Sequence, residues 1–258
     1  MTHSHIGTAV RWTTGAFGVA AAAYAAYVST VWIGYGHAPP PDPDAADPLL
    51  DRFMPRYEIA ERHHIQVAAP AEITFAAARE MDLNQSWIAR AIFRAREVVL
   101  GADADITTRP RGIVALTTSI GWGVLAEVPG QELVMGAVTQ PWKANVIFRP
   151  LAPDEFARFS DPDYVKIVWT VRADPIDSAH SMFRTETRAV ATDGESRRKF
   201  RRYWSFLSPG IILIRLTALG PLRADAEDRA RHDVGRRGVE QGAQCHARSQ
   251  RGTRKARA

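Results

Sequence analysis

The sequence lacks the residues on which several common architectures depend. Its 258 residues include one cysteine, Cys245, which excludes a disulfide framework and a zinc site built from several thiolates. No phosphate-binding loop, HExxH or GxSxG pattern occurs, so the common motif-bearing enzymes have no support. Hydrophobic residues make up 46% and charged residues 24% of the chain. This ordinary balance excludes a wholly disordered chain, a collagen-like repeat and a polytopic membrane protein.

The main part of the chain also lacks net charge. Residues 221–258 hold ten Lys/Arg and five Asp/Glu, a net charge of +5. Because the whole chain has 33 basic and 28 acidic residues, the first 220 residues hold 23 of each sign. A nucleic-acid-binding domain normally carries its basic stripe on the folded part. We therefore expect no nucleic-acid partner.

A long uncharged run stands out near the N-terminus. Residues 12–36 contain no charged residue, and a membrane-spanning helix needs about 20 apolar residues. Trp12 and Trp32 are 20 residues apart, which is about 30 Å along a helix and matches the hydrocarbon layer between two aromatic belts. The run predicts a single-pass transmembrane anchor at 12–36 after an N-terminal tail at 1–11. A cleaved signal peptide and a buried core helix are the alternatives.

The residues around the anchor bear on its orientation and packing. Arg11 precedes the run, and no basic residue follows until Arg52, which favours an N-terminus inside and an extracytoplasmic body. Small residues recur every four positions in the run, and this spacing allows two anchors to pack as a homodimer. These small residues are Gly18, Ala22, Ala26 and Thr30.

The rest of the chain divides into three parts. Residues 37–56 are rich in Pro and Asp, which indicates an extended, solvated linker that separates the anchor from the body. The body spans 57–230. Residues 231–258 carry few apolar side chains and predict a disordered basic tail.

The body has an α+β order of elements. A predicted strand at 57–69 leads to a helix opened by Pro70 and to a second, amphipathic helix from Asp82 to about Gly101. Alternation of apolar residues then predicts strands, the first two of them joined at Pro129-Gly130. A long helix follows, kinked near Pro209. The later strands are expected at 144–151, 164–173 and 180–192, and the helix at 193–222.

This order and three segments resemble the START-like (SRPBCC) superfamily. The segments are IQVAAPAEITFAAA, SMFRTETRAVATD and FRRYWSFLSPGIILIR, and the latter two resemble a bacterial subgroup of uncharacterised members. The resemblance covers about residues 57–230. It implies the helix-grip fold of polyketide cyclases and lipid-transfer domains, in which a curved antiparallel sheet grips the C-terminal helix around a cavity. It implies no particular ligand and no catalytic motif.

Strand parity and helix periodicity select the residues that face such a cavity. The expected ligand-binding residues are Trp169, Phe183, Thr185, Thr187, Phe200, Trp204 and Leu207. Arg184, Glu186 and Arg188 share the opposite strand face. They are either a polar site with Glu186 as an acid/base or a salt-bridge ladder on the outer surface, and the ladder is the commoner arrangement.

Two further sets of polar residues stand at notable positions in the body. His63 and His64 are adjacent on one strand and so face opposite sides; we expect no metal site and no cofactor. Five basic residues open the long helix, where they oppose the helix dipole unless anions are near. Anionic lipid headgroups are one partner for them. The five are Arg197, Arg198, Lys199, Arg201 and Arg202.

Three functions remain open at this point. The first is a membrane-anchored domain that binds a hydrophobic small molecule or lipid in an internal cavity. The second is a cyclase- or hydrolase-type enzyme that uses a pocket acid/base such as Glu186 or His180. The third is a scaffold whose interior is filled by its own side chains.

Overall fold

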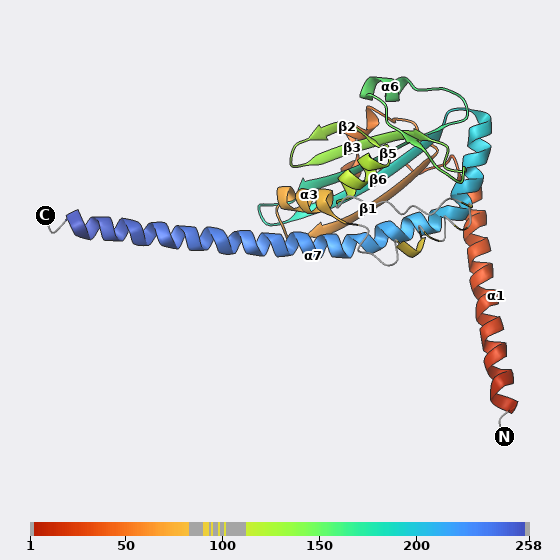
Figure 1. Cartoon of the computed structure of the whole chain (residues 1–258), viewed down its shortest axis with the longest axis horizontal. Helices are drawn as coiled ribbons and strands as arrows, with labels where there is room; N and C mark the ends of the chain where they lie inside the picture. The colour runs from red at the N-terminus through yellow and green to blue at the C-terminus, as the bar shows by residue number, and fades with distance from the viewer. Residues whose placement is uncertain are drawn as a thin grey trace.

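A computed structural model describes the backbone at residues 3–82 and 112–255 and at a few positions between them (Figure 1). Side chains are described from residue 18 to residue 233 within these ranges. The amphipathic helix expected from Asp82 to Gly101 lies largely outside the described residues. The positions between 83 and 111 that are described are 90–92, 94, 98 and 101.

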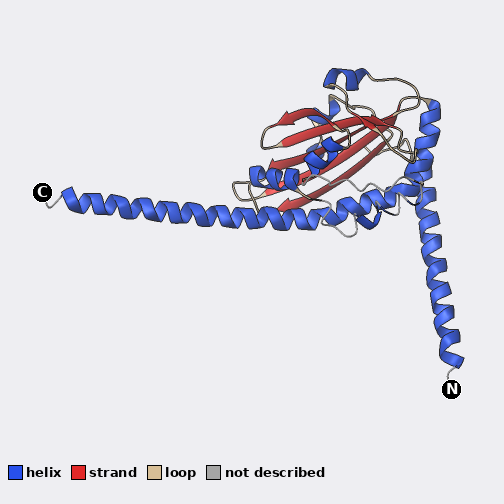
Figure 2. Ribbon diagram, viewed as in Figure 1, coloured by secondary structure: helices blue, strands red, loops and turns tan. Residues whose placement is uncertain are grey.

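The helices lie mainly at the two ends of the chain (Figure 2). The N-terminal helix α1 spans His3–Gly34, and α7 spans Gly194–Lys255. Between them are η1 (Pro43–Ala45), α2 (Pro48–Asp51), α3 (Ala71–Glu80), α5 (Ile113–Ser119) and α6 (Pro153–Arg158). No sequence pattern predicts α5, a helix of two turns that follows Gly112.

The sheet is open and antiparallel. Its order is β1-β6-β5-β3-β2, and β4 pairs with β3 beside this path. The strands are β1 (Ile59–Val67), β2 (Gly123–Val128), β3 (Glu132–Thr139), β4 (Phe148–Arg149), β5 (Val165–Pro175) and β6 (Ser181–Ala191). The chain is therefore α+β, with an open antiparallel sheet and a long C-terminal helix, as the order of elements predicts.

Turn chemistry accounts for the hairpin that joins β2 and β3. Gly130 has φ +75°, a left-handed conformation that glycine adopts without a steric penalty. The strand expected at 144–151 is shorter and comprises Phe148 and Arg149 alone. Pro150 follows directly, and it has no N–H to continue the ladder.

One face of the sheet lies under α3 and α7. Phe75 of α3 and Leu222 of α7 belong to one buried cluster with Trp169 and Phe183 of the sheet. A second cluster joins Phe200 and Trp204 of α7 to Ile59, Val165 and Ala189. This is the face on which the sequence places the expected cavity.

The opposite face of the sheet is covered as well, which corrects the expectation of a solvated linker. Leu50, Phe53 and Met54 are buried with Val134, Val138 and Val168 of β3 and β5. We call residues 43–57 the cover segment. Its few apolar side chains cover part of the second face, together with Leu151, Phe156 and Phe159, although Pro and Asp dominate its neighbourhood in the sequence.

The helix α1, which contains the expected anchor, is not detached from the body, contrary to the expectation that the prolines after residue 38 separate them. The Tyr24 hydroxyl of α1 donates to the Phe206 carbonyl of α7 over 2.7 Å, and the Tyr27 and Ser208 hydroxyls are 3.0 Å apart. Figure 1 shows α7 bending close to this contact. Pro209 lies inside the helix there, and an internal proline bends a helix because it removes a hydrogen bond.

The tail also differs from its expectation. The α7 helix continues to Lys255 and includes the residues after 230 for which the sequence predicts disorder. Arginine, alanine and glutamine are frequent in this stretch, and all three have a high intrinsic helix propensity. Low apolarity therefore does not by itself predict the absence of a helix.

One helix of the described residues is long and apolar enough to cross a membrane, judged by length and composition. It lies within Gly194–Asp233 of α7. Gly18–Gly34 of α1 is a shorter apolar helix. The helix that meets this criterion among the described residues is thus α7, where the sequence predicts a helix of the body.

Candidate functional site

The residues expected to line one cavity fall into two groups. Trp169 and Phe183 pack in the cluster beneath α3 and the later part of α7. Phe200 and Trp204 pack in the cluster at the beginning of α7. Ile167 contacts both clusters, so the two groups lie on the same face of the sheet but at different ends of it. Leu207 is half-buried.

The two expected threonines differ in their hydrogen bonding. Thr185 donates to the Thr170 carbonyl over 2.7 Å. The hydroxyl of Thr187 is buried and has no hydrogen-bond partner among the described residues. An unpaired buried hydroxyl is costly, so Thr187 offers a polar contact to a molecule placed against this face.

Glu61 and His63 of β1 join the threonines, and the sequence analysis did not select them. Strand register sets Glu61 opposite Thr187 and His63 opposite Thr185. Their side chains therefore share one face. The Nε2 atom of His63 is buried without a hydrogen-bond partner within the described chain, and it lies 4.0 Å from Oε2 of Glu61. We call Glu61, His63, Thr185 and Thr187 the polar patch.

The environment of the polar patch disfavours charge. Burial raises the pKa of Glu61, against the opposing charges of Arg215 and Arg62. Burial lowers the pKa of His63, and the positive charges of Arg215 and His64 lower it further. Both shifts favour the uncharged forms. A neutral imidazole with a free Nε2 has an open lone pair or N–H at that atom, and the unprotonated ring is the form that a general base needs.

The signal for this patch was present in the sequence. Ile59, Glu61, His63 and Ile65 alternate along β1, and Glu61 and His63 interrupt the apolar face. What the sequence does not show is that α7 packs over this strand. Arg215 lies 152 residues further on, and only the folded chain shows that it acts on Glu61 and His63.

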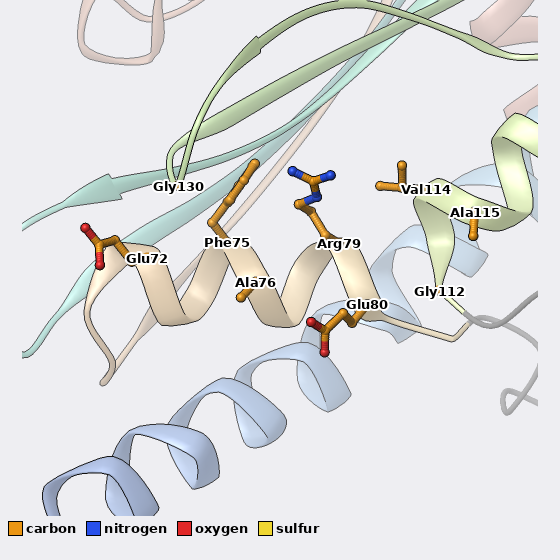
Figure 3. Close-up of a pocket in the computed structure, with 9 residues that line it drawn as sticks. All are labelled: Glu72, Phe75, Ala76, Arg79, Glu80, Gly112, Val114, Ala115 and Gly130. Carbon is orange, nitrogen blue, oxygen red and sulfur yellow. The ribbon is translucent and has the colours of Figure 1, made fainter. Parts of the chain in front are cut away.

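A hollow of about 820 Å³ lies beside α3 (Figure 3). Its floor includes Phe75, which is buried in the same cluster as Trp169 and Phe183. Arg79 extends across it from α3, lies over the Phe75 ring at 5.6 Å and pairs with Glu127 of β2. We call this space the α3 hollow. It is lined by Glu72, Phe75, Ala76, Arg79, Glu80, Gly112, Val114, Ala115 and Gly130.

A second, smaller hollow of about 510 Å³ lies on the other side of α3, between α3 and α7. Ala77 and Met81 line it from α3, and Ile214 and Leu222 line it from α7. Ligand sites in proteins are usually concave spaces of about 300–1,000 Å³ with mostly apolar walls and a few polar groups. Both hollows fall in this range.

Arg184, Glu186 and Arg188 do not face α7. They lie on the sheet face that the cover segment closes, where they form ion pairs. Arg184 pairs with Asp174 at 2.9 Å, and Arg188 pairs with Glu186 at 2.7 Å and with Asp51 of α2. This is the salt-bridge arrangement, although Arg188 is fully buried rather than on an outer surface. His180 is exposed and pairs with Asp177 at 3.0 Å.

The basic cluster at the start of α7 is partly satisfied within the protein. Arg197 pairs with Glu58 at 2.9 Å, and Lys199 pairs with Asp163 and Glu195, each at 2.8 Å. Arg201 lies over the Trp32 ring of α1 at 4.4 Å and donates to the Trp32 carbonyl. Arg198 and Arg202 are exposed.

No protein-family model and no curated protein matches the chain. Several solved structures resemble its fold. A hypothetical protein from Helicobacter pylori is 7% identical, with 73% of this chain and 99% of that chain covered and a TM-score of 0.36. A protein from Thermobifida fusca, solved by NMR in solution, is 15% identical, with 65% and 95% covered and a TM-score of 0.30.

An aromatase/cyclase from Streptomyces sp. R1128 is 13% identical, with 66% of this chain and 94% of that chain covered and a TM-score of 0.22. Identity and structural overlap are low in all three cases. The likeness therefore says nothing about the ligand or the activity of this chain.

Proposed function

We propose that the chain is a membrane-anchored domain of START-like, helix-grip type that binds a hydrophobic small molecule or lipid. The α3 hollow is the observation that carries the proposal. Its size suits a small amphiphile, and its apolar floor is continuous with the Trp169–Phe183 cluster. Burial of apolar ligand surface there contributes about 25 cal/mol per Å².

The charged rim of the α3 hollow supports an amphiphilic ligand. Arg79 is partly exposed and its ion pair with Glu127 is exposed, so a ligand carboxylate competes with Glu127 for the guanidinium. Exposed ion pairs contribute about 0–1 kcal/mol, so this exchange has a low cost. The apolar part of the ligand then contacts Phe75, Ala76 and Val114.

Native mass spectrometry of the full chain, released from detergent after incubation with a long-chain fatty acid, tests this proposal. The parent is expected to carry the fatty acid in a saturable manner. Ala76→Trp fills the α3 hollow and is expected to lose most of the bound ligand. Ala224→Trp introduces the same side chain at an exposed position of α7 and is expected to bind as the parent does. Absence of saturable binding to the parent contradicts the proposal.

A second candidate function is acid/base catalysis of the cyclase or hydrolase type. The observation that favours it is the unpartnered Nε2 of His63 beside Glu61. Turnover of a panel of aryl esters by the full chain tests it. His63→Gln is expected to abolish turnover, whereas His64→Gln alters an exposed residue on the opposite strand face and is expected to leave turnover unchanged. Equal activity in both variants contradicts a catalytic role for His63.

A further inference from the structure

The middle of α7 is unusually apolar for the surface of a domain. Residues 203–222 contain one charged residue, Arg215. Only 17% of the most apolar stretch of this helix is buried inside the protein. Phe206, Leu213 and Leu216 are 47%, 45% and 50% exposed. Exposed apolar surface that follows one helix face marks a contact with another molecule or with a membrane.

The exposed residues lie close together along α7. Leu213 and Leu216 are three positions apart, which places them on the same side of the helix after the bend at Pro209, and Phe206 lies three positions before that proline. We call these three residues the α7 stripe. The other side of the helix packs on the body through Trp204, Ile214 and Leu222, which are buried. A helix with one side fixed to the body lies along a membrane rather than across it.

The α7 stripe is continuous with exposed apolar residues of α1. The Tyr24 hydroxyl is bonded to the Phe206 carbonyl, so the two helices meet at the first residue of the stripe. Val19, further toward the N-terminus of α1, is 72% exposed. Figure 1 shows α1 leaving the body beside the bend in α7, while the rest of α7 runs crosswise to α1. A bilayer that holds the part of α1 extending from this contact toward the N-terminus therefore meets this part of α7 lengthwise.

The charges on α7 agree with a lipid surface. Arg202 and Arg223 are exposed, and they flank the apolar residues 203–222 at the two ends. Arg223 also lies 4.0 Å from the carboxylate of Glu227 on the same helix. Basic residues beside an apolar helix face attract anionic headgroups, at about 1 kcal/mol per residue near the surface. The charge of Arg215 does not interrupt the stripe, because it acts on Glu61 and His63 at the inner side of the helix.

We propose that residues 203–222 of α7 form a second membrane contact, in which the α7 stripe enters the acyl-chain boundary of a bilayer that contains anionic lipid. The contact holds the body against the membrane next to α1. This proposal rests on the proposed membrane anchor only for the orientation of α7 relative to the bilayer.

Single-cysteine labelling of the full chain in vesicles of phosphatidylcholine and phosphatidylserine tests this proposal. The background is Cys245→Ser, since Cys245 is the only cysteine. A fluorescent label is placed at Leu213→Cys or Leu216→Cys for the stripe, Val19→Cys for the anchor and Ile147→Cys for the body. Each of these side chains is exposed, so the substitutions leave the core intact. The readout is quenching by phosphatidylcholine that carries a nitroxide on its acyl chain.

Quenching at positions 213 and 216 is expected to match that at 19 and to exceed that at 147 several-fold. Quenching at 19 without quenching at 213 and 216 overturns the stripe contact and leaves the anchor standing. Quenching at 213 and 216 without quenching at 19 supports the stripe contact and overturns the anchor. Labels at 213 and 216 that are shielded from water but not quenched by lipid show that protein covers the stripe, which also overturns the proposal.

Discussion

The Nε atom of Arg188 lies 2.7 Å from Oε1 of Glu186, and both side chains are buried beneath the cover segment. Arg188 also donates to Asp51 and to the Met54 carbonyl. Arg62 of β1 reaches the same Oε1 of Glu186 at 3.0 Å. Through these contacts two strands are bonded to the segment that precedes the sheet in the chain. The ion pair is therefore part of the docking of the cover segment.

Replacing one member of this buried pair is expected to destabilise the fold strongly. Glu186→Leu leaves Arg188 buried with a reduced set of acceptors, which costs about 3–5 kcal/mol. Arg184→Met breaks the more exposed pair with Asp174 and is expected to cost about 1 kcal/mol or less. Denaturant unfolding of the two full-length variants against the parent measures the difference. Equal losses in the two variants contradict the special role of the buried pair.

The cover segment is expected to contribute to stability through its apolar residues. Leu50 is fully buried against β3 and β5, so Leu50→Ala is expected to cost about 2–5 kcal/mol. Ile147→Ala changes an apolar residue that is 78% exposed, and surface changes of this kind cost about 0.5 kcal/mol or less. Thermal unfolding of both variants in the same detergent provides the comparison. A loss for Leu50→Ala no larger than the control shows that the segment is not docked in solution.

The same packing changes the expected result of truncation. A body that lacks residues 1–56 loses Leu50, Phe53 and Met54 from the second face and loses two acceptors of Arg188. The sequence predicts a soluble monomer for this fragment, because its prolines suggest a spacer. The structure predicts an unstable one, because the fragment exposes Val134 and Val168.

The raised pKa of Glu132 makes the stability of the fold depend on pH. It is buried at the start of β3; burial and a hydrogen bond with Asp47 raise its pKa to about 8, against the charge of Arg172. The folded chain holds this proton more tightly than the unfolded chain does. The stability that Glu132 contributes is therefore complete below about pH 4.5 and is lost as the pH rises through about 8.

The variant Glu132→Gln keeps a neutral side chain at every pH and is expected to remove this loss. Its unfolding temperature is expected to exceed that of the parent at about pH 9, and the two are expected to converge at about pH 5. Glu155→Gln alters an exposed carboxylate on α6 and serves as the control. A parent and variant that differ equally at both pH values argue against a protonated Glu132.

The elements that the sequence predicts well are those with local signals. The alternation of apolar and polar residues predicts β5 and β6, and Pro129-Gly130 predicts the turn between β2 and β3. The long final helix also follows from its own residues. In each case the pattern lies within one segment, so no knowledge of its neighbours is needed.

The parts that were missed depend on contacts between distant segments. The cover segment has a composition typical of a linker. Leu50 and Met54 are buried because they pack on the apolar face of β3 and β5, which would otherwise be open to solvent. The polar patch needs both strand register and the approach of Arg215. The α7 stripe is visible in the sequence as apolar residues, but the pattern does not show which side of the helix packs on the body.

His63 gives the most direct test of the polar patch. Its pKa is lowered, first by burial and then by Arg215 and His64, whereas burial raises the pKa of Glu61 beside it. The folded chain therefore binds a proton at His63 less readily than the unfolded chain does. The stability that His63 contributes is present above its ordinary pKa of about 6.5 and is lost as the pH falls through the lower folded value. Glu61 acts in the opposite sense, since it takes up a proton more readily when folded.

The variant His63→Gln removes the loss of stability that comes from protonating His63 and keeps the contribution of Glu61. Its unfolding temperature is expected to fall less than that of the parent between about pH 7.5 and pH 5, while Gln66→Ala, which changes an exposed, non-titrating residue of β1, is expected to follow the parent. If His63→Gln loses as much stability in acid as the parent, the imidazole is not buried under α7 and the polar patch does not exist in solution.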